Sequence, residues 1–239
     1  RIVYDIIAER RRTGAEHFDL LGMLLAARDG DTGEGMSDLQ LRDETTTLLV
    51  TGHESTANAA MWIFFVLSQH PEIEQRVRDE LAAVCGQDTP DDGQLRELSY
   101  LRMVIEEVLR VYPPAWTTSR TAIEEDNILG YPVAAGTSVM ISPYVMHRNP
   151  RYWPDPEVFD PERHTPQMKE NRPKFAYVPF GGGPRNCIGA NFAMMELQLV
   201  VAMVAQRYRV AVVDADTVER EAIVSIRPKG GINVAIEAV

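Results

Sequence analysis

The stretch between Ser37 and Pro71 most constrains the fold, because no proline interrupts it. Ser37 and Gln40 have the spacing of a helix capping box, so a helix is expected to begin here and to run for more than thirty residues. Its second half, AAMWIFFVL, is apolar on every side, as in a helix that is buried all round. A helix this long exceeds the usual globular length and predicts a central strut.

The rest of the chain predicts a mainly α fold with a small β component in a single domain, residues 1–239. Further helices are expected at residues 1–28, 71–85, 98–112 and 187–208. Short β-branched stretches between residues 116 and 141 predict a small sheet, and residues 223–239 predict a closing hairpin. Residues 148–187 are rich in proline and glycine without periodicity, and so long an irregular segment is usually functional.

The composition narrows the function classes. Lys and Arg number 24 against 35 Asp and Glu, a net charge of -11 that argues against nucleic acid as a partner. The two cysteines, Cys85 and Cys187, make no disulfide framework, which predicts a reducing, cytoplasmic location. His53, Glu54 and Asn58 interrupt the most apolar run, so we expect no membrane span. The chain starts at Arg1, and no signal peptide is expected.

One cysteine lies in the loop FGGGPRNCIG, which runs from Phe180 to Gly189 and whose glycines lose much backbone conformational entropy on folding. A lone cysteine is most often a buried structural thiol. Here the loop leads into a helix, whose N-terminal N–H groups, together with Arg185, favour a thiolate at Cys187. Such a thiolate is a nucleophile or a metal ligand. No second cysteine or histidine cluster completes a zinc site, whereas one sulfur suffices as the axial ligand of heme.

This loop matches the pattern Phe-x-x-Gly-x-Arg-x-Cys-x-Gly at every fixed position, and the chain resembles the C-terminal half of the cytochrome P-450 heme-thiolate monooxygenases. The resemblance implies that the cofactor is heme b (iron protoporphyrin IX), with Cys187 as the iron ligand. The other cofactor-binding residues that it implies are Phe180, packed against the cysteine, Gly183 and Gly189, which give clearance, and Arg185 and Arg120, which bind the two propionates.

A second motif, EEVLR, contains Glu107 and Arg110. Alone it is an ordinary helical ion pair, and Glu106 has an equally good spacing to Arg110. In the family, an arginine from a Pro-Glu-Arg segment joins the pair, and FDPERH supplies Arg163. The resemblance implies three structural residues that fix the cysteine loop. His164 replaces the usual aromatic residue, a change expected to matter little, and none of the five histidines is expected to be a ligand.

The third motif, TGHEST, lies within the long helix. The plain interpretation is that these are polar residues within a buried helix, whose Ser and Thr hydroxyls donate hydrogen bonds to carbonyls four residues earlier. The family places an acid and a threonine here for proton delivery to dioxygen, and Glu54 matches the acid, while Ser55 replaces the threonine. Thr51 and Ser55 share a helix face, whereas Thr56 is rotated by about 100°. We expect Ser55 and Thr51 to hold a water that Glu54 supplies with protons, and Thr56 is the fourth candidate catalytic residue.

The resemblance also places the segment after the paired prolines on the substrate side of the heme. The candidate specificity residues there are Ala115, Trp116, Thr117, Thr118 and Ser119. The family's N-terminal half has no counterpart in the chain, which predicts a fragment that needs a partner, self-association or its own missing half. Without that half, AAMWIFFVL is expected to be exposed as an apolar patch.

The function expected is that of a monooxygenase that inserts one atom of dioxygen into a small hydrophobic substrate. No flavin or iron–sulfur motif is present, so a ferredoxin, flavodoxin or reductase is expected as the electron donor. Two alternatives stay open. One is a peroxide-driven peroxygenase or isomerase, against which the pair Glu54–Ser55 argues, and the other is a non-catalytic heme-binding or interaction fragment.

Overall fold

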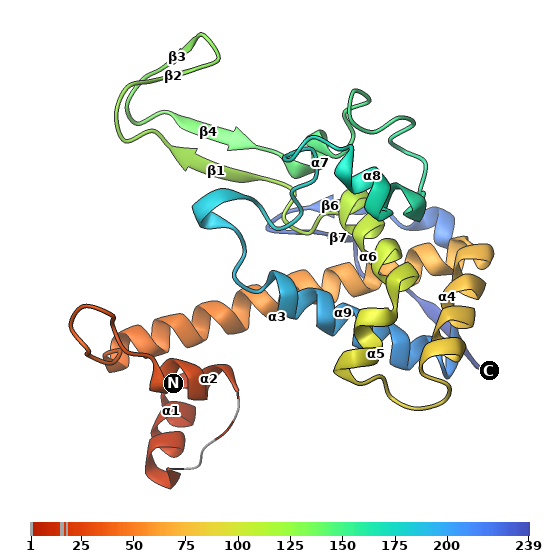
Figure 1. Ribbon diagram of the computed structural model, residues 1–239, viewed down its shortest axis with the longest axis horizontal. Helices are drawn as coiled ribbons and strands as arrows, with labels where there is room; N and C mark the ends of the chain where they lie inside the picture. Colours follow the sequence, from red (N-terminus) through yellow and green to blue (C-terminus); the bar gives the residue numbers. More distant parts are fainter. Residues whose placement is uncertain (1, 15–16, 18) are drawn as a thin grey trace. The chain divides into compact units, whose positions relative to one another are not determined.

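The computed structural model describes residues 2–14, 17 and 19–239, and the chain divides into two compact units, Arg1–Glu54 and Ser55–Val239. Helix α3 (Asp38–Gln69) begins in the first unit and ends in the second. The fold is mainly helical with small two-stranded sheets, as the sequence predicts (Figure 1). Among the described residues, no helix combines the length and the apolar character needed to cross a membrane.

The first unit contains α1 (Ile2–Thr13), α2 (Leu20–Ala26) and the start of α3. The single helix expected over residues 1–28 is wrong. Gly14 follows α1 with φ +61, a left-handed conformation that ends helices. Asp19 then caps α2 by accepting a hydrogen bond from the Gly22 N–H at 2.8 Å. Residues 1, 15, 16 and 18 of the expected helix lie outside the described residues.

The long helix is confirmed, and α3 spans 32 residues. Its capping box has formed, because the Gln40 N–H donates to Ser37 Oγ at 3.3 Å and the Ser37 N–H donates to Gln40 Oε1 at 3.0 Å. The next helix, α4 (Pro71–Val84), begins at the proline that was expected to open it.

The core of the second unit lies where α3 meets α4, α6 (Ser99–Val111) and α9 (Ala190–Ala205). Its fully buried side chains include Trp62, Ile63, Leu101, Leu197 and Val201. The AAMWIFFVL segment is therefore part of this core, and the exposed patch expected there is wrong for Ala59, Trp62, Ile63, Val66 and Leu67, each at most 4% exposed. A short helix that the sequence analysis missed, α5 (Asp92–Glu97), joins α4 to α6.

Two hairpins follow α6, and they confirm the expected small sheet. Strand β1 (Thr118–Thr121) pairs antiparallel with β4 (Ser138–Ile141), and β2 (Asp126–Ile128) pairs with β3 (Tyr131–Val133) at the tip (Figure 1). The irregular stretch after β4 holds only short helices. These are α7 (Pro143–Met146), η1 (Pro161–His164), α8 (Pro166–Glu170) and η2 (Gly183–Arg185).

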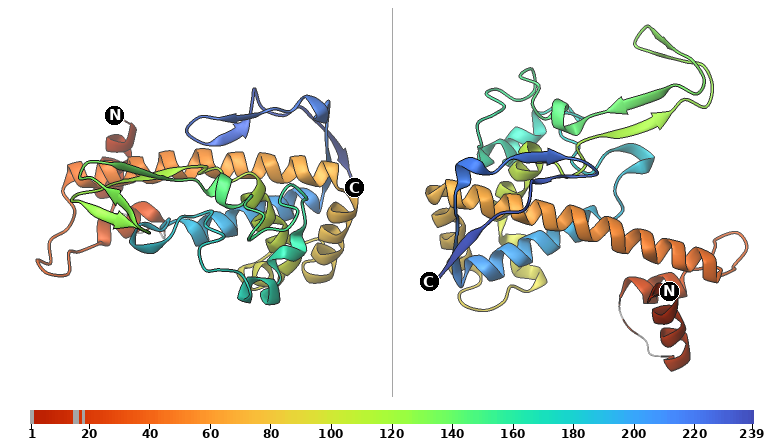
Figure 2. Two further views of the ribbon diagram at one scale, coloured as in Figure 1. Left: turned by 90° about the horizontal axis from the view of Figure 1, so that it is seen from above. Right: turned by 180° about the vertical axis from the view of Figure 1, so that it is seen from behind.

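The closing hairpin expected at residues 223–239 is wrong, because the two strands in this range, β7 (Ile226–Pro228) and β8 (Val234–Ala238), belong to different sheets. Strand β7 pairs with β6 (Arg220–Ala222), and β8 pairs with β5 (Tyr208–Val212). Gly230 and Gly231, both with positive φ, separate β7 from β8. The β6–β7 hairpin runs beside α3, where Asn58 donates to Ser225 Oγ at 2.7 Å (Figure 2).

The core predicts a sharp contrast between two leucines. Leu101 is fully buried, whereas Leu49 is 61% exposed. Leu101→Ala should lower the free energy of unfolding by about 2–5 kcal/mol, because it removes buried contacts and leaves a cavity. Leu49→Ala, the matched control, should change it by less than about 0.5 kcal/mol. Urea denaturation of the chain measures both, and equal losses would contradict this core.

Candidate functional site

The cysteine loop is closed by its own backbone. The Cys187 N–H donates to the Phe180 carbonyl at 2.9 Å, and the Asn186 N–H donates to the Gly183 carbonyl at 3.1 Å. Gly181 and Gly183 have φ of +78 and +70, which glycine adopts at no steric cost. The loop therefore depends on glycine for its conformation and brings Cys187 to the start of α9, which has Gly189 as its N-cap.

The surroundings of Cys187 are open. The residue is exposed, and a Cβ added at Gly183 would meet no atom within 4 Å. A Cβ at Gly189 would lie 3.9 Å from Cys187 Sγ, an ordinary contact distance. Open space therefore lies beside Gly183, and no contact within the chain requires glycine at position 189.

The other cysteine has the opposite environment. Cys85 is buried, and burial raises the pKa of its thiol. A thiol of this kind is chemically inert, so only Cys187 has the exposure of a ligand or nucleophile. No group of three His, Cys, Asp or Glu residues that could hold a metal ion occurs in the described part of the chain.

Arg120 and Arg185 are exposed, and in the described ranges neither forms an ion pair with a carboxylate. Arg120, on β1, donates from Nη1 to Thr118 Oγ1 at 3.1 Å and to the Ser119 carbonyl at 2.8 Å. Guanidinium groups bind carboxylates through paired N–H donors. Both arginines are thus available to an anionic group from outside the chain.

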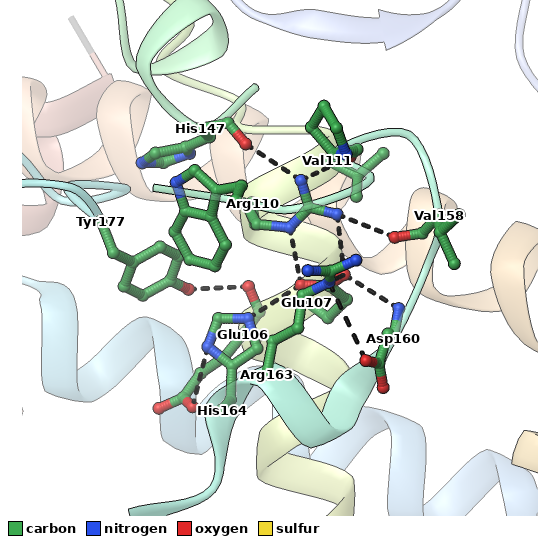
Figure 3. A network of polar contacts seen from close by, with 12 residues as sticks. Glu106, Glu107, Arg110, Val111, His147, Val158, Asp160, Arg163, His164 and Tyr177 are labelled. Atoms are coloured by element: carbon green, nitrogen blue, oxygen red, sulfur yellow. Dashed lines mark hydrogen bonds and ion pairs between the residues drawn. The ribbon is translucent and has the colours of Figure 1, made fainter. Parts of the chain in front are cut away.

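The buried ion pair of α6 is fully enclosed. Arg110 and Glu107 are both 0% exposed, and two hydrogen bonds of 2.8 Å join the guanidinium to the carboxylate. The remaining N–H groups of Arg110 donate to three main-chain carbonyls, those of His147 at 3.0 Å, Pro156 at 2.7 Å and Val158 at 3.1 Å (Figure 3). All five guanidinium donors are therefore satisfied.

The Glu107 carboxylate contacts the segment that contains Arg163. Its Oε1 accepts a hydrogen bond from the Asp160 N–H at 2.9 Å, and its Oε2 lies 2.9 Å from His164 Nε2 (Figure 3). Arg163 Nε lies farther away, 3.6 Å from Glu107 Oε1. The structure thus brings the three expected residues together, but it adds His164 as a closer partner.

The charges in this network follow from these contacts. Burial alone would raise the pKa of Glu107, but hydrogen bonds from Arg110 and His164 outweigh it and lower that pKa below its usual range. Burial lowers the pKa of His164, although Glu107 opposes this shift. Glu107 is therefore a carboxylate, and a carboxylate only accepts hydrogen bonds. Consequently a neutral His164 donates from Nε2.

The TGHEST residues all lie in α3. Thr51 Oγ1 donates to the Thr47 carbonyl at 2.7 Å, which is the bond to the previous turn that the plain interpretation expects. Its hydroxyl can then only accept a further hydrogen bond. Glu54, Ser55 and Thr56 are half-buried. The division between the two compact units falls between Glu54 and Ser55.

The candidate specificity segment joins α6 to β1. Trp116 donates its indole N–H to the Ile223 carbonyl at 3.0 Å, which ties this segment to the β6–β7 turn. The Trp116 carbonyl accepts from Ser142 Oγ at 2.9 Å. Ala115 is exposed, and Thr117 and Thr118 are half-buried. The backbone of this segment is therefore held in place while small side chains remain accessible.

Comparisons with known proteins identify the family of the chain. The family model described as Cytochrome P450 matches residues 2–234. Cyclooctat-9-en-7-ol 5-monooxygenase of Streptomyces melanosporofaciens is 41% identical over 217 residues, which are 91% of this chain and 47% of that protein. Cytochrome P450 4V2 of Rattus norvegicus is 40% identical over 192 residues, 79% of this chain and 36% of that protein.

Among solved structures, the cytochrome P450DA heme domain superposes with a TM-score of 0.93 at 28% identity, covering 100% of this chain and 52% of that chain. The chain spans half or less of the length of these two curated relatives.

The buried ion pair predicts unequal costs for two adjacent glutamates. Glu107→Gln should lower the free energy of unfolding by about 3–5 kcal/mol, because it leaves the charge of Arg110 buried without a counter-charge. The Glu106 side chain is 10% exposed, but its carboxylate lies 2.6 Å from Nζ of Lys169, whose side chain is 40% exposed and solvated. Glu106→Gln therefore leaves no enclosed charge unpaired and should cost less than Glu107→Gln. Urea denaturation distinguishes them. A Glu107 variant as stable as the Glu106 variant would contradict the role given to this pair.

Proposed function

Because this chain belongs to the cytochrome P450 family, we propose that it is the heme-thiolate part of a monooxygenase that inserts one atom of dioxygen into a small hydrophobic molecule. The observation that carries the proposal is the exposed Cys187, held by a glycine loop at the start of α9. We further propose that residues 1–239 act as one heme-thiolate domain, completed by a partner segment that corresponds to the other half of the relatives.

The residues around Cys187 fit heme b. The thiol is exposed, the space beside Gly183 is open, and Arg120 and Arg185 have no carboxylate partner in the described ranges. Cys187 would hold the iron, and the two arginines would bind the propionates. When bound, heme supplies dioxygen activation, to which the thiolate contributes electron density. Phe180 would fix the loop from its other end through its carbonyl.

Proton delivery is assigned to the TGHEST motif. Ser55 would hold a water at the reaction site, and Glu54 would supply it with protons. Thr51, whose hydroxyl proton is engaged by Thr47, would accept a hydrogen bond from that water. The sequence spacing supports Ser55 over Thr56, because residues four apart share a helix face and residues five apart do not.

The substrate and the electron donor are proposed at the level of chemical class. A relative named for oxidation of cyclooctat-9-en-7-ol supports a hydrophobic small molecule as the substrate, and Trp116 is the largest apolar group of the candidate specificity segment. The sequence contains no flavin or iron–sulfur motif, so a ferredoxin, flavodoxin or reductase would supply electrons. A cytoplasmic location is consistent with two unpaired cysteines.

The two cysteines give a matched test of the ligand. After addition of heme, reduction and carbon monoxide, the chain should show the strongly red-shifted Soret band of thiolate-ligated heme. Cys187→Ser should abolish that band, because serine supplies no thiolate, and Cys85→Ser should retain it. An ordinary Soret band in the unsubstituted chain would contradict the heme-thiolate proposal and favour a binding or interaction fragment.

The proton-delivery assignment predicts a contrast between adjacent hydroxyls. In active protein, Ser55→Ala should lower the product formed per reduced cofactor and release the difference as hydrogen peroxide, whereas Thr56→Ala should leave that ratio near the unsubstituted value. The reverse pattern would transfer the role to Thr56. Turnover with peroxide alone, and none with reductant, would instead indicate a peroxygenase.

A further inference from the structure

Three consecutive residues before the cysteine loop are each held by a different buried group. We call Ala176–Val178 the clamped segment. The Ala176 carbonyl accepts the indole N–H of Trp153 at 3.1 Å. The Tyr177 hydroxyl donates to a main-chain carbonyl of α6 at 2.7 Å, that of Glu106. Phe180, the first residue of the loop, follows the clamped segment after a single proline.

The third hold on the clamped segment comes from His147. The Val178 N–H donates to His147 Nε2 at 2.9 Å. The carbonyl of the same histidine accepts from Arg110 Nη1 at 3.0 Å. His147 is 0% exposed, and its ring lies against Tyr177 with centroids 5.2 Å apart (Figure 3). One residue therefore contacts the buried ion pair through its main chain and the clamped segment through its side chain.

The direction of the bond to Val178 fixes the state of the imidazole. A backbone N–H can only donate, so Nε2 must be unprotonated and the proton of a neutral ring lies on Nδ1. Burial lowers the pKa of His147 to about 3, and the positive charge of Arg148 also disfavours its charged form. His147 Nδ1 is buried without a hydrogen-bond partner among the described residues. The ring thus keeps the Nε2 bond even though its other nitrogen is left unsatisfied.

We propose that His147 is a positioning residue for Cys187, because its Nε2 fixes the main chain at Val178 and so sets the position from which the cysteine loop starts. A ring that only filled space would need no acceptor, and phenylalanine would serve equally well. A positioning ring needs an acceptor at the place of Nε2. Glutamine can provide one there through its amide oxygen, whereas the shorter asparagine side chain cannot reach it.

Amide hydrogen exchange of the heme-free chain tests the bond directly. In His147→Phe and His147→Asn, the Val178 amide should exchange about tenfold faster or more relative to the amides of α6, because it loses its acceptor. In His147→Gln it should stay close to the unsubstituted rate. Tyr177→Phe is the control, because it removes the bond to Glu106 and leaves the Val178 bond intact.

Two outcomes would overturn the proposal. One is a Val178 amide that stays protected in a folded Asn or Phe variant. The other is a folded Gln variant in which that amide is as exposed as in the Asn variant. The Gln variant keeps the test decisive if the Phe variant fails to fold.

The heme spectrum then links the bond to the thiol. This arm rests on the proposed heme-thiolate function. Among heme-loaded, carbon monoxide-bound samples, the fraction with the red-shifted Soret band should fall in His147→Asn and recover in His147→Gln. A fraction that is the same in both variants would overturn the link to Cys187. If the unsubstituted chain lacks the band while amide exchange behaves as expected, the proposed function fails and the hold on Val178 stands.

Discussion

The buried pair of Glu107 and Arg110 is the interaction on which the rest of the site depends. Burying two charges costs more than their attraction returns unless hydrogen bonds satisfy their remaining donors and acceptors. Here main-chain carbonyls and N–H groups of residues 147–160 do so. Those residues belong to an irregular segment with few hydrogen bonds from regular secondary structure. The ion pair therefore gives this segment the internal partners that a helix or a strand would otherwise supply.

This dependence extends from the ion pair to the thiol in steps that are each a short contact. Arg110 holds the main chain of His147, His147 holds Val178, and the Val178 carbonyl accepts from Gly181 inside the loop at 3.1 Å. The loop then closes on itself through Phe180 and Cys187. The first steps join buried groups, so the exposed thiol is connected to the buried ion pair although its own loop contains four glycines.

The elements that sequence predicts well are those with local causes. The length of α3 follows from its capping box and the absence of proline, and the paired strands follow from β-branched residues between turns. The break between α1 and α2 depends on Gly14, whose left-handed backbone no periodicity reveals. The closing hairpin was wrong because β8 finds its partner in β5, more than twenty residues upstream.

The site residues likewise divide into those with a local sequence signal and those that depend on contacts distant in sequence. The spacing in FGGGPRNCIG and EEVLR locates Cys187 and the ion pair, because these motifs are contiguous. His164 contacts Glu107 across 57 residues and His147 contacts Val178 across 31, so neither has a spacing signal. For His164, the available signal was its departure from an aromatic residue next to Arg163. A polar ring at a position that usually holds an apolar one indicates a buried hydrogen-bond acceptor nearby.

The order of these groups along the chain has a consequence for biosynthesis. The groups that hold the clamped segment, from the Glu106 carbonyl to the Val178 N–H, all precede Cys187 in the sequence. During synthesis from the N-terminus, a nascent chain therefore carries every donor and acceptor that holds the clamped segment before the thiol has been added. The groups that hold the clamped segment are therefore already present when the reactive thiol leaves the ribosome.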